Sequence, residues 1–256
     1  MSSSARFMTS FISRIVTHYW GVIGIIAAWQ AWVSITGVNS IVMPHPWDVV
    51  ADVIHNPGIY WQNGIQTLLL AAGGLLLGMA LGTLIAVAAW TSRFLSGVLV
   101  PLGLMFSSIP VVSLIPVLAR LLGYDVKTVL AIVVIISFFP AFVFTAAGLR
   151  GAPPGSDDLF KVLGASGWRR FIHLIVPSAV PHWMIALRIA APPAILAAMV
   201  AEFLMGMSGL GYLFRTAATD FDTARAFGTS AVATVISVVC FSAATAAEAR
   251  VNARWR

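Results

Sequence analysis

Charged residues are scarce in this sequence. Only 9% of its 256 residues are Asp, Glu, Lys or Arg, whereas 59% are hydrophobic; soluble domains average about 25% charged and about 45–50% apolar. Charged residues are absent from five long stretches: 15–47, 53–92, 94–119, 128–149 and 226–247. As helices, stretches of this length can cross a hydrocarbon core of about 30 Å. The composition therefore excludes an ordinary soluble domain and favours a helical protein that crosses the lipid bilayer several times.

Motifs for catalysis and for metal or nucleotide binding are also missing. The single cysteine, Cys240, permits neither an internal disulfide nor a thiolate metal site. Neither of the two lysines, Lys127 and Lys161, follows a glycine, so the sequence has no GxxxxGK phosphate loop. There is no HExxH or GxSxG motif, and the basic residues form no stripe interleaved with aromatics. We expect a chain that is not an enzyme, holds no cofactor or metal, and binds no nucleic acid.

Apolar runs separated by polar segments predict six membrane-spanning helices, with boundaries uncertain by a few residues. The expected spans are 18–36, 63–90, 97–122, 127–149, 180–204 and 225–247. The first apolar run lacks a small-x-small cleavage site, so we interpret it as a helix that stays in the protein and not as a signal peptide. Six spans place both termini on the same side of the membrane.

The Lys and Arg residues are distributed unequally between the two sets of connections. Ten lie on one side: Arg6, Arg14, Arg93, Arg150, Lys161, Arg169, Arg170, Arg250, Arg254 and Arg256. Four lie on the other: Arg120, Lys127, Arg215 and Arg225. Cytoplasmic loops carry the excess of basic residues. We therefore expect a multi-pass membrane protein with both termini and the long connection between the fourth and fifth spans in the cytoplasm.

Glycine and proline mark particular places within the expected spans. Gly74, Gly78 and Gly82 recur every four residues in the second span, which predicts a face that another helix approaches closely in lipid. Prolines in the third, fourth and fifth spans predict kinks, because each lacks an amide donor and clashes with the preceding turn. These prolines are Pro101, Pro110, Pro116, Pro140, Pro192 and Pro193.

A few polar residues inside the expected spans are candidates for a transport pathway or gate. An arginine at the bilayer centre costs about 2.5–3.5 kcal/mol, so Arg188 either contacts substrate or, the interpretation we favour, extends its side chain to the cytoplasmic interface. Glu202 is expected near the extracytoplasmic end, where it caps or pairs with loop residues. The hydroxyl candidates are Ser107, Ser108, Ser113, Ser137 and Thr145.

The connection between the fourth and fifth spans, from residue 156 to 177, has the most informative pattern. Asp157 and Asp158 begin a short helix, where acidic side chains suit the helix dipole. Gly164 can supply a tight turn, and a second amphipathic stretch follows as far as Pro177. Two short helices joined at a glycine and projecting from a membrane protein are suited to the groove of a soluble partner.

The spacing of this connection resembles the cytoplasmic loop of the permease subunits of binding-protein-dependent ABC importers. That family's pattern is Glu-Ala-Ala, three residues, Gly, nine residues, then Ile-x-Leu-Pro. The corresponding residues are Asp158, Leu159, Phe160, Gly164, Leu174, Val176 and Pro177. The spacing is kept throughout, while Asp replaces Glu, Leu-Phe replaces Ala-Ala, and Leu and Val replace the closing Ile and Leu.

Other segments resemble the branch of this family that imports nitrate, sulfonates, taurine and related small molecules. They are Met43-Pro44-His45-Pro46 with Val49 and Val50, Ala186-Leu187-Arg188-Ile189-Ala190, Ala201-Glu202-Phe203-Leu204, and Gly209-Leu210-Gly211-Tyr212. The segment from Ala186 to Ala190 differs from the branch pattern only in Ala186, which replaces a glycine.

The resemblance implies an all-α integral membrane protein with the type I ABC importer permease fold, a single permease domain over 1–256 with six transmembrane helices and a cytoplasmic coupling helix. It implies a second copy as homodimer partner, two cytoplasmic ATPase subunits that bind ATP and Mg, and an extracytoplasmic solute-binding protein. The residues implied to couple to the ATPase are Asp158, Leu159, Gly164, Ala165, Trp168, Arg169 and Pro177.

The function implied is that of the permease subunit of an ATP-driven importer, which forms the pathway for a small polar or anionic solute. A neutral heterocycle such as a vitamin precursor, carried by the same mechanism, is one alternative. An ion-coupled secondary transporter is another, but it requires ionisable residues near the midplane, for which only Arg188 and Glu202 are candidates. A membrane-embedded enzyme is disfavoured by the missing catalytic motifs.

Overall fold

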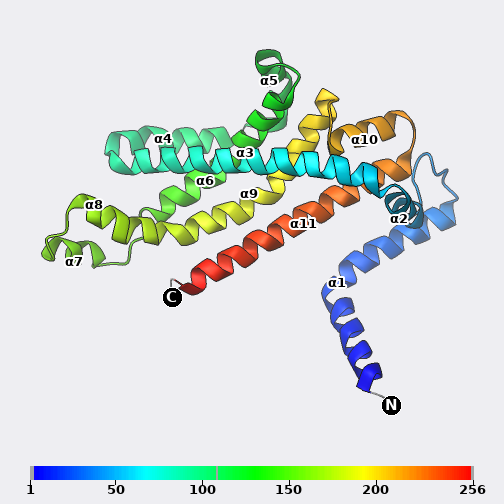
Figure 1. The fold of residues 1–256 in the computed structure, drawn as a ribbon, viewed down its shortest axis with the longest axis horizontal. Helices are drawn as coiled ribbons and strands as arrows, with labels where there is room; N and C mark the ends of the chain where they lie inside the picture. Colours follow the sequence, from blue (N-terminus) through cyan, green and yellow to red (C-terminus); the bar gives the residue numbers. More distant parts are fainter. Residues whose placement is uncertain (1–2, 108, 255–256) are drawn as a thin grey trace. The chain divides into compact units, whose positions relative to one another are not determined.

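The computed structural model describes the backbone of residues 3–107 and 109–254, and side chains from residue 20 onward except those at 93, 100, 104, 106 and 107. Every regular element in this part of the chain is a helix (Figure 1). The elements are α1 Ser3–Thr36, α2 Pro46–His55, α3 Pro57–Thr91, α4 Arg93–Ser107, η1 Val111–Leu114, α5 Ile115–Leu122, α6 Val126–Gly148, α7 Ser156–Val162, α8 Gly167–Arg170, η2 Phe171–Ile175, α9 Val176–Met205, α10 Leu210–Thr219 and α11 Thr223–Arg254. The all-helical prediction is confirmed for the described residues.

Four helical segments of the described chain are long and apolar enough to cross a membrane. They are Pro57–Thr91, Val126–Gly148, Gly167–Met205 and Thr223–Arg254. Of three shorter apolar helices, Trp20–Thr36 lies within the first expected span, and Phe94–Gly103 and Val111–Leu122 overlap the third. Ser108, one of the candidate pathway residues, lies outside the described residues, as does the side chain of Ser107.

The expected third span, 97–122, is not one continuous helix. It consists of α4, the short 3₁₀ helix η1, and α5, with the break just before Pro110, whose ψ of 102° is extended. A proline disfavours helical geometry in the residue that precedes it, which explains the break. Pro116 lies in the first turn of α5, where its missing amide donor costs nothing.

The chain divides into two compact units, one of residues 1–57 with 216–228 and the other of residues 58–215 with 229–256. The first unit contains α1, α2 and the first turns of α11. In it, the Trp29 and Phe227 rings lie 5.4 Å apart, and Arg225 Nη2 donates to Asp52 Oδ1 at 3.0 Å. Side chains of α1 and α2 therefore contact residues more than 170 positions further along the chain.

The core of the second unit is built from α3, α6 and α9, and it contains many small residues. Ala186, Ala190, Ala194 and Ala198 recur every four residues along α9, and each is at most 1% exposed. Because residues four apart share one face of a helix, this alanine row lets α9 pack closely in the bundle. The sequence analysis did not identify the row, since alanine is also common on helix faces that meet lipid.

The glycine row of the second expected span lies against α6. A Cβ atom added at Gly78 would lie 2.7 Å from the Ser137 Cβ atom, and one added at Gly82 would lie 2.7 Å from the Ala141 Cβ atom. Real Cβ atoms do not approach this closely. The predicted close helix approach is therefore confirmed, with α6 as the neighbouring helix. Residue numbers rise together on the two helices, so α3 and α6 run in the same direction.

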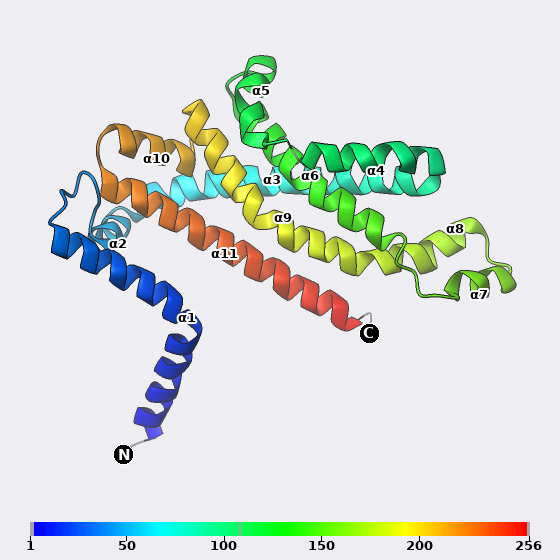
Figure 2. The ribbon, with the colours of Figure 1, turned by 180° about the vertical axis from the view of Figure 1, so that it is seen from behind.

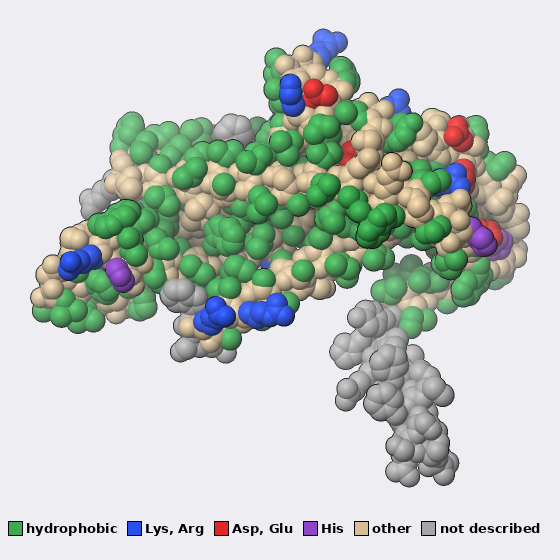
Figure 3. All heavy atoms as spheres, in the orientation of Figure 1, with side chains coloured by type: hydrophobic (Ala, Val, Ile, Leu, Met, Phe, Trp, Pro, Cys, Tyr) green, Lys and Arg blue, Asp and Glu red, His purple; other side chains and the backbone are tan. Residues whose placement is uncertain are grey.

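The surface of the second unit separates apolar from basic regions. Hydrophobic side chains cover most of the visible face of its long helices (Figure 3). Lys and Arg side chains gather near α7 and α8, near the C-terminal end of α11, and at α5. Seen from both sides, the C-terminal ends of α3, α6 and α11 point toward the same end of this unit as α7 and α8 (Figures 1 and 2). Basic residues therefore gather at helix ends of this unit.

Candidate functional site

Residues 156–170 form a hairpin of two short helices, α7 and α8, which we call the 156–170 hairpin. Gly164, at the end of α7, has a φ of 67°, in the left-handed region that favours glycine. The Gly164 amide donates to the Lys161 carbonyl and the Ala165 amide to the Phe160 carbonyl, each at 3.0 Å. This pair of bonds is a Schellman motif, which ends a helix and reverses the chain. The tight turn predicted at Gly164 is confirmed.

Polar contacts hold the hairpin together. Arg170 in α8 forms an ion pair with Asp157 in α7, at 3.1 Å between Nε and Oδ1. Within α7, Lys161 Nζ lies 3.0 Å from Asp158 Oδ1, and Ser166 caps α8 by accepting from the Arg169 amide. Surface ion pairs contribute little stability one at a time. Together with the Schellman turn, however, they fix the angle between the two helices.

The outer surface of the hairpin is apolar. Leu159, Val162, Leu163 and Trp168 are all exposed, although such residues normally turn inward in a soluble domain. The exposed Trp168 ring also stacks on the Phe171 ring, with centroids 5.9 Å apart. The hairpin thus combines a rigid backbone with an exposed apolar surface.

The hairpin joins α9 through a short π-helical segment, η2, in front of Pro177. The Val176 amide donates to the Phe171 carbonyl, five residues back. Pro177 has no amide to continue the regular α-helical ladder, and its ring crowds the carbonyl four residues earlier. The Phe171 ring also lies 5.3 Å from the Trp90 ring near the end of α3. The segment η2, which follows the hairpin directly, therefore continues into α9 and contacts α3.

Arg188 has an acidic partner on another membrane helix. Its Nε atom lies 3.1 Å from Glu248 Oε2 in α11, and the two side chains are 33% and 12% exposed. The pair lines a cavity of about 570 Å³ that also includes Thr245 and Asn252. The sequence analysis missed Glu248 because it lies one residue beyond the expected sixth span. An ion pair between spans reduces the cost of placing either charge in the membrane.

We expect Glu248→Gln to lower the yield of folded protein, because Arg188 then lacks its counter-charge. The cost of placing an arginine at the bilayer centre, about 2.5–3.5 kcal/mol, is an upper limit for the effect, since part of the Arg188 side chain remains exposed. The double variant with Arg188→Gln removes both charges and should recover yield. Fluorescence-detected size-exclusion chromatography of detergent extracts measures the folded fraction. A double variant with lower yield than Glu248→Gln alone would show that the pair does not act through its charges.

Glu202 is 1% exposed and connects three helices of the second unit. Its Oε2 atom accepts hydrogen bonds from Thr67 Oγ1 in α3, at 2.8 Å, and from the Gly211 amide in α10, at 3.0 Å. The Thr67 hydroxyl oxygen in turn accepts from the Leu210 amide at 2.8 Å. The first amides of a helix have no partner within the helix, and a carboxylate suits that end of its dipole. Glu202 therefore caps α10, as the sequence analysis anticipated for a loop contact.

The glycines of the Gly209–Tyr212 motif leave room for this cap. The Gly209 amide donates to Asn63 Oδ1 at 3.1 Å, so three consecutive amides bond to side chains of α3 and α9. Gly209 has a φ of 100°, and a Cβ atom there would overlap the Glu202 carboxylate. A Cβ atom at Gly211 would overlap the Met199 carbonyl oxygen. The glycines of the Gly209–Tyr212 motif therefore have a structural role, because they allow α10 to be held against α3 and α9.

No hydrogen bond joins the three hydroxyl candidates whose side chains the structure describes. Ser137 is fully buried and lies against Gly78, Thr145 is also buried, and Ser113 is exposed in η1. Their role in a pathway stays a prediction.

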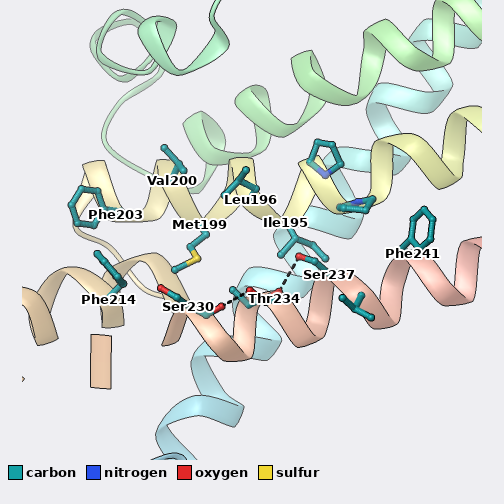
Figure 4. A pocket seen from close by; sticks show the side chains of 14 residues that line it. Ile195, Leu196, Met199, Val200, Phe203, Phe214, Ser230, Thr234, Ser237 and Phe241 are labelled. Carbon is teal, nitrogen blue, oxygen red and sulfur yellow. Dashed lines mark hydrogen bonds between the residues drawn. The ribbon is translucent and has the colours of Figure 1, made fainter. Parts of the chain in front are cut away.

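An apolar cavity of about 740 Å³ lies in the second unit between α9, α10 and α11 (Figure 4). Its lining is almost entirely apolar and includes Pro192, Met199, Phe203, Phe214 and Phe241. The hydroxyls that reach it bond to their own helix: Thr234 Oγ1 donates to the Ser230 carbonyl at 2.8 Å. Such a cavity can hold apolar groups but offers no charge. Among the described residues, no cluster of His, Cys, Asp and Glu could hold a metal ion.

Comparisons with known proteins agree with this picture. Residues 53–256 match the family of binding-protein-dependent transport system inner membrane components. The chain is 30% identical to the formylaminopyrimidine transport permease ThiX of Halalkalibacterium halodurans, over 78% of this chain and 81% of that protein. It is 29% identical to SsuC of Escherichia coli, a permease named for aliphatic sulfonates, over 75% and 73% of the two chains.

A solved structure gives the same fold. An amino acid ABC transporter crystallised with histidines superposes with a TM-score of 0.67 at 16% identity, over 78% of this chain and 97% of that one. The family match extends from α2 to the end of the chain and includes the four long apolar helices. The chain therefore belongs to the binding-protein-dependent transport family, and it is a multi-pass ABC importer permease, a transport subunit whose ATPase is a separate protein.

Proposed function

We propose that two copies of this permease form the membrane pathway of a plasma-membrane importer, and that the 156–170 hairpin of each copy is the coupling element that docks into a cytoplasmic ATPase subunit. The ATPase subunits bind ATP and Mg, and an extracytoplasmic binding protein delivers the solute. The observation that carries the proposal is the hairpin itself, with exposed Leu159, Leu163 and Trp168 on a backbone fixed by Gly164. An exposed apolar surface on a rigid projection is suited to a partner's groove.

The direction of the helices supports six crossings. Because α3 and α6 run in the same direction, the segment between them, residues 92–125, has to return across the membrane. The broken helix α4–η1–α5 is the segment available for that crossing. With α1 as the first crossing, the count is six, and both termini share the side of the 156–170 hairpin. The basic residues near that hairpin and at the end of α11 support a cytoplasmic location for this side.

The cargo we propose is a small polar or anionic solute, with a neutral heterocycle as the second candidate. Relatives are named for both classes, formylaminopyrimidine in one and aliphatic sulfonates in another. Ser113 is exposed and uncharged, so it suits a pathway that conducts without binding tightly. Selectivity then lies with the binding protein, whose thermal shift with sulfonates and with pyrimidines separates the two classes.

Cysteine labelling tests the orientation on which docking depends. In a Cys240→Ala background, single cysteines replace Ser4, Asn56 and Ser156. An impermeant thiol reagent added to intact cells should label position 56 only, because positions 4 and 156 are expected in the cytoplasm. After cell lysis, all three positions should react. Labelling of position 156 in intact cells would place the hairpin outside and contradict its contact with a cytoplasmic ATPase.

A further inference from the structure

The helix α2 has an exposed apolar face that nothing in its own unit covers. Trp47, Val50 and Ile54 are 71%, 48% and 67% exposed. They are spaced three and four residues apart, so they lie on one side of the helix. Asp48 and His55, which are also exposed, lie seven residues apart on a second, polar side. The outward surface of α2 is thus divided into an apolar face and a polar face.

The third side of α2 faces the protein. Pro46 and Val49 are buried, and Asp52 forms an ion pair with Arg225 at 3.0 Å. A helix with one side on protein, one side apolar and one side polar has the surfaces expected at a boundary between lipid and water.

The neighbours of α2 place it beside the beginnings of membrane helices. Arg225 belongs to the first turn of α11, and Thr223 at the start of α11 donates to the Ser40 carbonyl at 2.5 Å. The candidate span α3 begins at Pro57, two residues after α2 ends. Helix ends of this kind lie at the membrane surface. Tryptophan is enriched at that depth, because its ring is apolar while its indole N–H needs a polar partner.

We infer that α2 is an interfacial anchor whose Trp47, Val50 and Ile54 face is inserted into the headgroup and upper acyl region of the extracytoplasmic leaflet. The turn before α2 extends this apolar surface with Ile41 and Val42, which are 52% and 70% exposed. Residues 15–92 contain no Lys or Arg, so anionic lipids offer no charge attraction. Burial of apolar surface drives the insertion, which is therefore independent of lipid charge.

The test uses bimane-labelled single cysteines in the full-length Cys240→Ala permease, copurified with its ATPase and reconstituted into vesicles. Val50→Cys and Ile54→Cys report on the apolar face of α2. Asp48→Cys and His55→Cys are matched controls on its polar face. Brominated phosphatidylcholine quenches a fluorophore in lipid, and iodide quenches one in water. We expect positions 50 and 54 to lose most of their emission to the brominated lipid and little to iodide, with the reverse at 48 and 55.

The same quenching pattern should appear in pure phosphatidylcholine vesicles and in vesicles that contain phosphatidylglycerol. Quenching of positions 50 and 54 by iodide would place this face in water and overturn the inference. Protection of both positions from both quenchers would mean that a second copy or another protein covers the face, which also overturns it. If one of the two variants fails to fold, the other reports on the same face one turn away. No outcome depends on transport activity.

Discussion

Replacing Gly78 with leucine is expected to abolish the folded permease in the membrane. The Cβ atom alone would lie 2.7 Å from the Ser137 Cβ atom and 2.7 Å from the Val134 carbonyl oxygen of α6. Backbone atoms cannot move aside as a flexible side chain can, so α3 and α6 would have to separate. Overpacking in a core costs about 1–3 kcal/mol and occasionally more, and here a further three side-chain carbons follow the Cβ. We expect the loss of monodisperse protein in size-exclusion chromatography and the loss of transport.

Ala72→Leu is the matched control for this prediction, because Ala72 is exposed on the same helix. It adds comparable apolar volume at an exposed position. Its yield and transport should be close to those of the parent protein. Equal behaviour of the two variants would show that the approach of α3 to α6 is not required.

Replacing Gly164 with valine is expected to uncouple the permease from its ATPase while leaving it in the membrane. The left-handed φ of 67° at this position is unfavourable for a β-branched residue by about 1–3 kcal/mol. A Cβ atom added at Gly164 would meet no atom within 4 Å apart from its chain neighbours, so we attribute the effect inside the permease to backbone strain and not to crowding. The strain opens the Schellman turn and rotates α8 against α7. ATPase copurification and substrate-stimulated ATP hydrolysis should both fall several-fold.

Gly164→Asn separates backbone strain from the loss of glycine as such. Asparagine tolerates the left-handed region better than other non-glycine residues, so this variant should retain much more ATPase than Gly164→Val. Membrane yield should be normal for both variants, because Gly164 lies outside the long apolar helices. Full transport by Gly164→Val with normal ATPase binding would remove the hairpin from the coupling mechanism.

Features that depend on neighbouring residues in the sequence could be predicted. The turn at Gly164 follows from acidic residues at one end of a short helix and glycine at the other, which are local signals. The glycine row of α3 follows from a four-residue period, which reports the face of a helix directly. The sequence could not identify α6 as the helix on that face, because a period does not encode a partner.

Contacts between residues that are far apart in the sequence could not be predicted. Glu202 was expected to meet a loop, but its bond to Thr67 joins residues 135 positions apart. Asn63 and Thr67 lie in an apolar helix with no pattern that marks them as caps for α10. Glu248 could have been found as a counter-charge for Arg188 only if the orientation of α9 beside α11 had been known. The third expected span was divided because the effect of Pro110 on the preceding residue outweighed a continuous apolar composition.

The two attachments of the 156–170 hairpin have a mechanical consequence. One is covalent, through η2 into α9, and the other is the ring contact of Phe171 with Trp90 at the end of α3. Because the Trp168 ring stacks on Phe171, we expect a displacement of Trp168 to act on both α9 and α3. Because the glycines of α3 pack directly against α6, a displacement of α3 is also expected to act on α6. The hairpin is therefore connected to three membrane helices and not to α9 alone.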